Sequence, residues 1–276
     1  MGFFSRPDED LAQLAIAVVG SAEDPEYVAG NIILEGAANP AKLTTTTGSW
    51  VLEFGSKIAP VAVALIFQYL DAGLEVLLQG NDTDSWGSPS FEQSLTIPAK
   101  RLDGPSYQRW TNNVYEALGE LDDEDGYLFW RLVVVGTNSQ PIAVGRLMLP
   151  STLHDVTLFH DGDIPEGDDT GEINHETELG VENIYVLDGP RRSVSAPFIG
   201  TDLDAGNAPV QEAADFRALH ESCEGRKHPF LFQPFPDRPP WLVRFESAKS
   251  PRSHRLGGYQ VWQIAVKEVS RGVPWP

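Results

Sequence analysis

The clearest pattern of hydrophobic and polar positions lies between Ser49 and Asp82. Three short apolar runs occur there, over residues 50–54, 61–67 and 76–78. In the first run, Trp50, Leu52 and Phe54 occupy every second position, which is the period of a strand that buries one face. Glycine and aspartate separate the runs, and short strands divided by such turns predict a β-sandwich.

The remainder of the first half predicts further strands and little helix. Apolar or alternating runs favour strands over residues 27–34, 128–135 and 143–149, and the acidic segment LDDEDG at 121–126 favours a hairpin tip. Residues 37–47 are small and polar, with four consecutive threonines, and indicate a loop. We therefore expect an N-terminal arm over 1–26 and a sandwich domain over 27–150.

A second pattern begins near residue 151. It predicts strands over 181–187, 191–199, 229–232, 241–245 and 259–266, and an acidic surface loop over 161–172. One helix is expected over 209–223, because Asn207 is a suitable cap and Gly225 a suitable stop. The predicted fold class is mainly β: a jelly-roll β-sandwich followed by a β-barrel-like domain over 151–276 with one inserted α-helix.

Charge and length exclude several classes of function. The 276-residue chain carries a formal net charge of −20, a field that favours solubility and repels phosphate backbones, so we expect no nucleic-acid partner. No apolar stretch approaches 18 residues, so we expect no membrane span, and the N-terminus lacks the features of a signal peptide. The sole cysteine, Cys223, falls on the apolar face of the predicted helix and is interpreted as a core residue.

The sequence contains no recognisable catalytic constellation. None of the six histidines forms an HExxH motif, and there is no phosphate loop or dinucleotide fingerprint. The best metal-binding candidates are His154 and His160 with Asp161 and Asp163, and the acidic loop at 161–172 is a second candidate for a cation. Solvated charges and surface histidines are the commoner outcome. We expect no metal, no cofactor and no enzymatic activity.

Trp86 is the candidate binding residue. It lies in a polar, turn-rich loop at 81–89 together with Asp82 and Asp84. The tryptophan occupies a position where a calcium loop needs an oxygen ligand, which disfavours calcium. Three roles are open for Trp86: stacking on a sugar, contact with a partner protein, or local packing.

Several segments resemble a known family. WVLEFG, VAVALIFQYL and LEVLLQGND, followed by YLFWRLVVVGTNSQPIAVGRLML, resemble the galactose-binding-like β-sandwich domain of minor tail and distal tail-tip proteins from long-tailed, siphovirus-like bacteriophages. RRSVSAPFIG and ADFRALHESCEGRKHPFLFQP resemble the barrel domain of the same proteins. Together the resemblance covers residues 28–268.

The resemblance implies a structural component of a phage tail tip, located in the virion tail and assembled in the host cytoplasm. Such a protein assembles with itself in a ring and links the tail tube to hub or fibre proteins. The alternative is a carbohydrate-binding module, or a receptor-binding tail protein for host attachment that recognises a surface glycan. A hydrolase is a second alternative.

Overall fold

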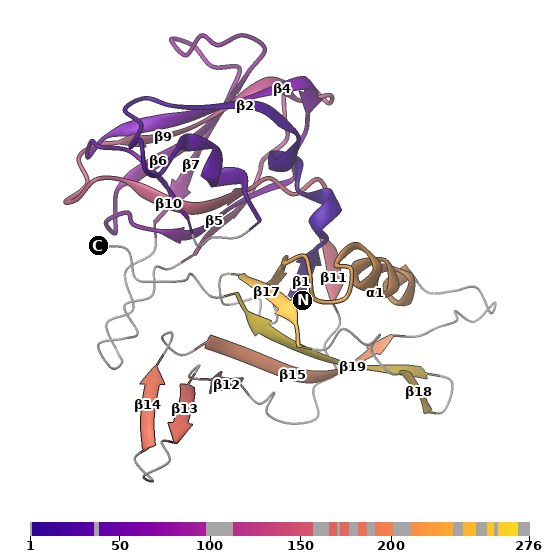
Figure 1. Ribbon diagram of the computed structural model, residues 1–276. Coiled ribbons are helices and arrows are strands. Elements are labelled where there is room, and N and C mark those ends of the chain that lie inside the picture. Colours follow the sequence, from indigo (N-terminus) through magenta and orange to yellow (C-terminus); the bar gives the residue numbers. More distant parts are fainter. Residues whose placement is uncertain are drawn as a thin grey trace.

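The computed structural model describes residues 2–35, 39–97, 113–156, 211–233, 240–246 and 259–269, and the strands 166–169, 172–176, 182–186, 191–200 and 253–256. Within these residues the chain is mainly β, with one α-helix, α1 (Gln211–Ser222). The strands gather into two groups, here named the sandwich module and the second module (Figure 1). No helix in the described part of the chain is long and apolar enough to cross a membrane.

The sandwich module consists of two antiparallel sheets. The five-stranded sheet has the order β2 (Ala15–Gly20), β4 (Gly48–Ile58), β9 (Tyr127–Val135), β6 (Glu75–Asn81), β7 (Phe91–Thr96). The four-stranded sheet has the order β3 (Ala41–Lys42), β10 (Ala143–Met148), β5 (Ala62–Gln68), β8 (Val114–Ala117). The strands expected from the three opening runs are all present, and the predicted sandwich is confirmed.

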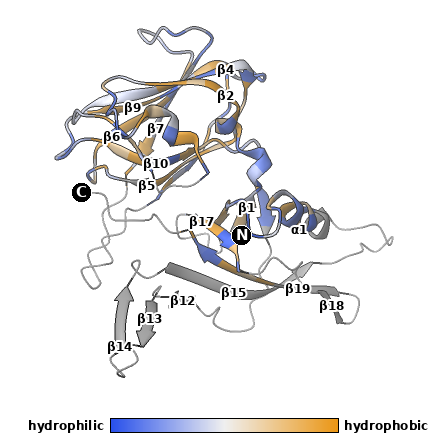
Figure 2. Cartoon of the chain, in the orientation of Figure 1, coloured by the Kyte–Doolittle hydropathy of each residue, from blue (hydrophilic) through white to orange (hydrophobic). Residues whose placement is uncertain are grey.

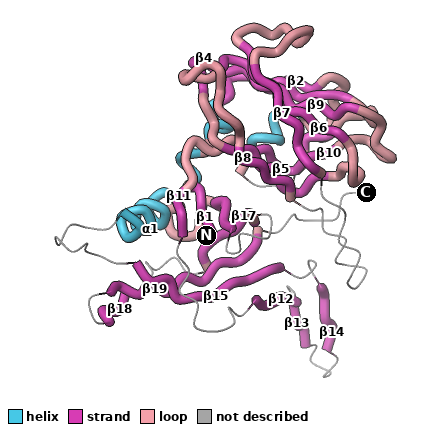
Figure 3. Tube along the Cα trace, turned by 180° about the vertical axis from the view of Figure 1, so that it is seen from behind, coloured by secondary structure: helices cyan, strands magenta, loops and turns pink. Residues whose placement is uncertain are grey.

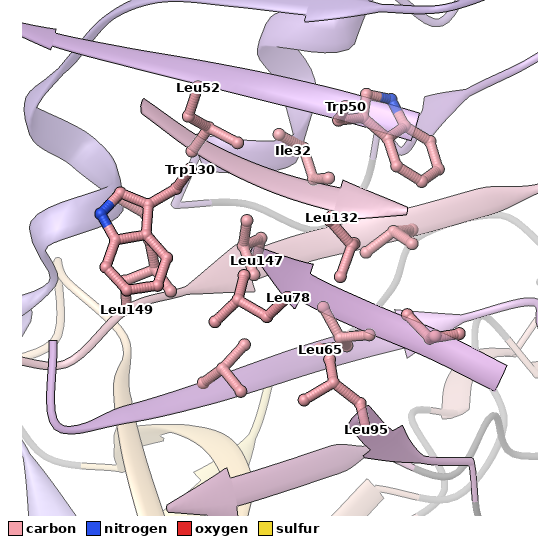
Figure 4. Packing of buried hydrophobic residues seen from close by; sticks show 14 of the residues in the cluster. Ile32, Trp50, Leu52, Leu65, Leu78, Leu95, Trp130, Leu132, Leu147 and Leu149 are labelled. Carbon is pink, nitrogen blue, oxygen red and sulfur yellow. The ribbon is translucent and has the colours of Figure 1, made fainter. Parts of the chain in front are cut away.

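Alternating apolar residues build the core between these sheets. Trp50 and Leu52 of β4 and Trp130 and Leu132 of β9 are fully buried and face Leu65 of β5 (Figure 4). Hydrophobic residues run along the strands of this module, interrupted by hydrophilic ones (Figure 2). Burying a side chain of this size stabilises the folded state by about 1.5–3 kcal/mol relative to leaving it exposed. The shared core therefore holds the two sheets together.

Four local predictions in this module were wrong. The segment 121–126, expected to be a hairpin tip, connects β8 to β9, which lie in different sheets, and the expected loop 37–47 contains strand β3. Strand β4 does not end at Gly55 but continues to Ile58, with an irregular register between Glu53 and Ile58 that re-aims the strand. Residues 27–34 form the 3-10 helix η3 (Ala29–Ile33) in place of a strand. Its buried residues, Ala29 and Ile32, are three positions apart, which is the period of a 3-10 helix.

The second module contains an eight-stranded antiparallel sheet. Its order is β11 (His154–Val156), β1 (Gly2–Ser5), β16 (Phe230–Gln233), β17 (Trp241–Phe245), β19 (Tyr259–Glu268), β15 (Arg191–Gly200), β12 (Glu166–Asp169), with β18 (Ser253–Leu256) also paired to β19. A separate hairpin joins β13 (Glu172–Glu176) to β14 (Glu182–Val186). The predicted helix is confirmed as α1, whose Phe216 and Leu219 pack, together with Cys223 just beyond it, against Phe230 and Trp241.

The structure places two further segments differently from their expected forms. Residues 1–26, expected to form an arm, contribute β1 to the sheet of the second module and β2 to the sandwich module, linked by the 3-10 helices η1 (Pro7–Glu9) and η2 (Leu11–Leu14). Phe4 of β1 is fully buried, and Ala15 and Val18 of β2 pack against the sandwich core. The acidic segment 161–172, expected to be a loop, contains strand β12 and the first residue of β13, and its other residues lie outside the described part of the chain.

The two modules share an apolar junction. Phe3 of β1 and Leu231 of β16 belong to one buried cluster with Ile66 of β5 and Met148 of β10. Viewed from behind, β1 and β17 lie next to the sheet that contains β5 and β8 (Figure 3). Strand β10 is buried at all six positions, and it contributes Val144 and Leu147 to the sandwich core and Met148 to this junction.

Candidate functional site

The predicted binding residue Trp86 lies in the loop between β6 and β7. Its Nε1 donates a hydrogen bond to Asp84 Oδ1 at 2.6 Å, and the guanidinium carbon of Arg131 lies 4.6 Å from the centre of its ring. Trp86 is half-buried, whereas Asp84 is exposed. The loop therefore holds the indole by one cation–π contact and one hydrogen bond while part of the ring still reaches solvent.

Arg131 belongs to a polar row on the outer face of the five-stranded sheet. Register places Gln79 of β6 beside both Arg131 of β9 and Glu92 of β7. Arg131 Nε donates to Gln79 Oε1 at 2.8 Å, and Gln79 Nε2 donates to Glu92 Oε2 at 2.5 Å. Burial lowers the pKa of the Arg131 guanidinium, while Asp84 and Glu92 act in the opposite direction. The row fixes the arginine beneath the tryptophan ring.

The loop itself is anchored by polar contacts at its base. Asn81 Nδ2 donates to the Ser85 carbonyl at 2.6 Å, and Ser90 Oγ donates to Asn81 Oδ1 at 3.1 Å. Asp82 accepts a hydrogen bond from Lys57 Nζ at 2.9 Å, and the same ammonium contacts Asp123 in the acidic connection between β8 and β9. These hydrogen bonds, to Asp123 first and Asp82 second, raise the pKa of Lys57. The Trp86 loop is thus pre-positioned without a ligand.

The three residues singled out from sequence do not share one role. Trp86 and Asp84 contact each other, whereas Asp82 binds Lys57 at the base of the loop. The sequence analysis missed Arg131 and Lys57. Arg131 was detectable as the sole cation inside the apolar run LFWRLVVV, at a position that alternates with buried Trp130 and Leu132. We name the surface formed by Trp86, Arg131, Asp84 and Glu92 the Trp86 surface.

A second cluster of ionisable residues lies where the 3-10 helix η1 meets β11 and α1 of the second module. His154 Nε2 lies 2.8 Å and 3.0 Å from the two carboxylate oxygens of Glu9, and its Nδ1 lies 3.3 Å from Asp215 Oδ2. The ring of His154 therefore lies between two carboxylates, one on η1 and one on α1. Burial alone would raise the pKa of Glu9, but hydrogen bonds from His154 and Arg6 lower it below its ordinary value.

A fully buried ion pair lies where the segment between η1 and η2 meets β10. Arg146 and Asp10 have fully buried side chains, joined by a 2.7 Å contact from Nη2 to Oδ2. Asp10 Oδ1 also accepts from the backbone of Leu149 at 3.0 Å, and Arg146 Nη1 donates to the Glu35 carbonyl at 3.1 Å. The Glu35 carboxylate in turn lies 2.7 Å from His228 Nδ1. These contacts run from the sandwich module to the second module and stabilise their attachment.

The structure addresses only part of the predicted metal candidates. His154 is engaged with Glu9 and Asp215, whereas His160, Asp161 and Asp163 lie outside the described residues. Among the described residues, no group of three or more histidine, cysteine or acidic side chains could hold a metal ion. Burial raises the pKa of the Cys223 thiol to about 12, in keeping with a core residue. The absence of enzymatic activity stays a prediction.

Comparison with known proteins gives structural neighbours only. No family model and no curated protein matches the chain. Solved structures with some likeness include the family 32 carbohydrate-binding module of AlyQ in complex with 4,5-unsaturated mannuronic acid, at 11% identity and a TM-score of 0.36, covering 49% of this chain and 94% of that one.

Two further solved structures match this chain over a similar share of its length. The chitosan-binding module 1 from a chitosanase/glucanase of Paenibacillus sp. IK-5 has 11% identity and a TM-score of 0.37, covering 53% of this chain and 98% of that one. The family 32 module of C. perfringens NanJ in complex with galactose has 6% identity and a TM-score of 0.37, covering 54% and 98%. A proposal of function for this chain has to come from its own residues.

Proposed function

We propose that the chain binds carbohydrate through the Trp86 surface. The observation that carries the proposal is the position of Trp86: an indole held on the outer face of the sheet by Arg131 and Asp84, yet only half-buried. Arg131 lies against this ring, and the part of the ring that still reaches solvent can contact the apolar face of a sugar.

The surroundings of the ring supply hydrogen-bonding groups for sugar hydroxyls. Asp84 and Glu92 are exposed carboxylates that accept hydrogen bonds, and Ser85 and Ser90 are exposed hydroxyl residues of the same loop. The loop is held by Asn81 and Lys57 before a ligand arrives, which lowers the ordering cost of binding. An aromatic platform edged by fixed polar groups is a suitable arrangement for a hydroxylated ring.

The test is a glycan array screened with the full chain, followed by calorimetry on the best ligand. We expect Trp86→Ala to weaken binding at least about tenfold, which corresponds to about 1.4 kcal/mol, and Trp86→Phe to retain part of it. Val61→Ala is the matched control, because Val61 is 41% exposed and precedes β5 of the other sheet. A blank array, or equal affinity for Trp86→Ala and the parent chain, would contradict the proposal.

A second candidate is a structural subunit of a phage tail tip, as the sequence resemblance implies. The observation that favours it is the junction, where β1 joins the sheet of the second module and Phe3 packs against Ile66 of the sandwich. Modules fixed to each other in this way suit a load-bearing subunit more than a freely tethered binding module. The proposed role is assembly in a ring that links tail tube to hub or fibre proteins.

The tail-tip candidate has its own experiment. We expect the chain to co-sediment with intact tail particles and to appear at their distal end after immunogold labelling. Tails purified with the chain absent from them would count against this role. The result is independent of the glycan array, because neither outcome of one fixes the outcome of the other.

A further inference from the structure

One edge of the five-stranded sheet, formed by residues 17–20 beyond an irregularity in the strand, pairs with no further strand among the described residues. Strand β2 is an end strand of that sheet, paired on one side with β4. Residues 11–20 contain no charged side chain. Leu14, Ile16 and Val19 are 60%, 66% and 60% exposed, the three highest values among the large apolar side chains of the described residues. An exposed apolar strand at a sheet edge is a template for another strand.

The opposite edge of the same sheet shows how this protein protects a strand. Strand β7 carries Glu92 at its second position and follows Pro89 in the preceding loop. Charge and proline are common devices that keep edge strands apart. Strand β2 has neither, although the whole chain carries a net charge of −20, and its one irregularity, between Ala15 and Ala17, leaves residues 17–20 regular.

The charge distribution indicates which molecule can pair with the exposed edge of β2. Two copies of a chain with 40 acidic and 20 basic residues repel each other over most of their surface. The repulsion is weakest where a stretch without charge faces its own equivalent, and an unpaired strand edge requires an extended partner. A second copy of β2 meets both conditions. We propose that β2 pairs with β2 of a second copy about a twofold axis, which makes one continuous sheet across the dimer.

The faces of β2 fix the register of this pairing. Val18 packs against the sandwich core, whereas Ala17 and Val19 lie opposite Glu53 and Val51 on the outer face of the sheet. Directly opposed residues of an antiparallel pair share a face. With Val18 on the axis, Val19 of each copy faces Ala17 of the other, so each exposed valine gains a cross-strand apolar neighbour on the outer face of the sheet.

The first test is the mass of the full chain measured by sedimentation equilibrium over a range of protein and salt concentrations. We expect a dimer that tightens as salt rises, because screening weakens the repulsion between two acidic copies. Val19→Lys should weaken dimerisation at least tenfold. Val135→Lys is the matched control and should leave it unchanged, because Val135 is an apolar residue, 40% exposed, at the end of β9.

The second test reads the register directly. Because Cys223 is buried, new surface cysteines can be cross-linked selectively. A mixture of Ala17→Cys and Val19→Cys chains should form a disulfide-linked dimer faster than either chain alone. A monomer at all concentrations, a dimer insensitive to Val19→Lys, or a monomer that captures an unrelated extended peptide at β2 would overturn the proposal. Glycan binding by Val19→Lys should equal that of the parent, so this failure is distinct from a failure of the Trp86 surface.

Discussion

Two regions of this protein each contain an arginine, but the two arginines have different roles. On the outer face of the sandwich, Arg131 supports a half-buried tryptophan and contacts Gln79. At the junction, Arg146 is fully buried and paired with Asp10. A cation–π contact at an exposed site contributes about 0.5–1 kcal/mol, whereas removing one partner of a buried ion pair costs about 3–5 kcal/mol. Burial therefore separates a surface that is free to meet a ligand from a junction that holds the modules together.

The largest expected loss of stability follows from breaking the buried ion pair at the junction. Asp10→Asn should lower the free energy of unfolding by about 3–5 kcal/mol, because it leaves the buried Arg146 charge without its counter-ion. Asp84→Asn on the Trp86 surface is the control and should change it by no more than about 0.5 kcal/mol. Urea denaturation of both variants measures the difference. Similar values for the two would remove the distinction between the regions.

The second prediction concerns the stability of the fold at low pH. The pKa of Glu9 is lowered in the folded state, so its contribution is present above the ordinary pKa of a glutamate and is lost as pH falls through the lowered value. Glu9→Gln should cost about 1.5–3 kcal/mol at neutral pH, as expected for hydrogen bonds to a charged group. It should also flatten the loss of stability in acid. Denaturation midpoints measured across the acidic range check the slope, and an unchanged slope would exclude Glu9 as the group responsible.

Sequence patterns predicted the sandwich because its strands bury one face and expose the other, as Trp50 and Leu52 show. They also located α1, whose apolar face has helical spacing. They did not place β1, since a strand of four residues has too little pattern to show that it joins β16, more than two hundred residues away. Arg131 could be noticed as a lone cation in an apolar run, but its contact with Trp86 depends on a loop folding back over the sheet. Such long-range contacts are set by topology.

The smallest expected effect concerns the base of the Trp86 loop. Lys57→Ala removes the contacts to Asp82 and Asp123 and should lower the free energy of unfolding by less than Glu9→Gln does, because the groups are near solvent. The loss should shrink at high salt. Glycan affinity should fall less than it does for Trp86→Ala, since the ring keeps Arg131 and Asp84 as partners. A loss of stability as large as that of Asp10→Asn would show that the loop is part of the core.

The most direct test of the account is a titration of the chain with a glycan, followed through the indole Nε1–H signals in nitrogen-15 NMR. Trp86 is assigned as the signal missing in Trp86→Phe. The account predicts that this signal shifts in step with saturation while those of the buried Trp50 and Trp130 do not. Saturable glycan binding that leaves the Trp86 signal unmoved would contradict it.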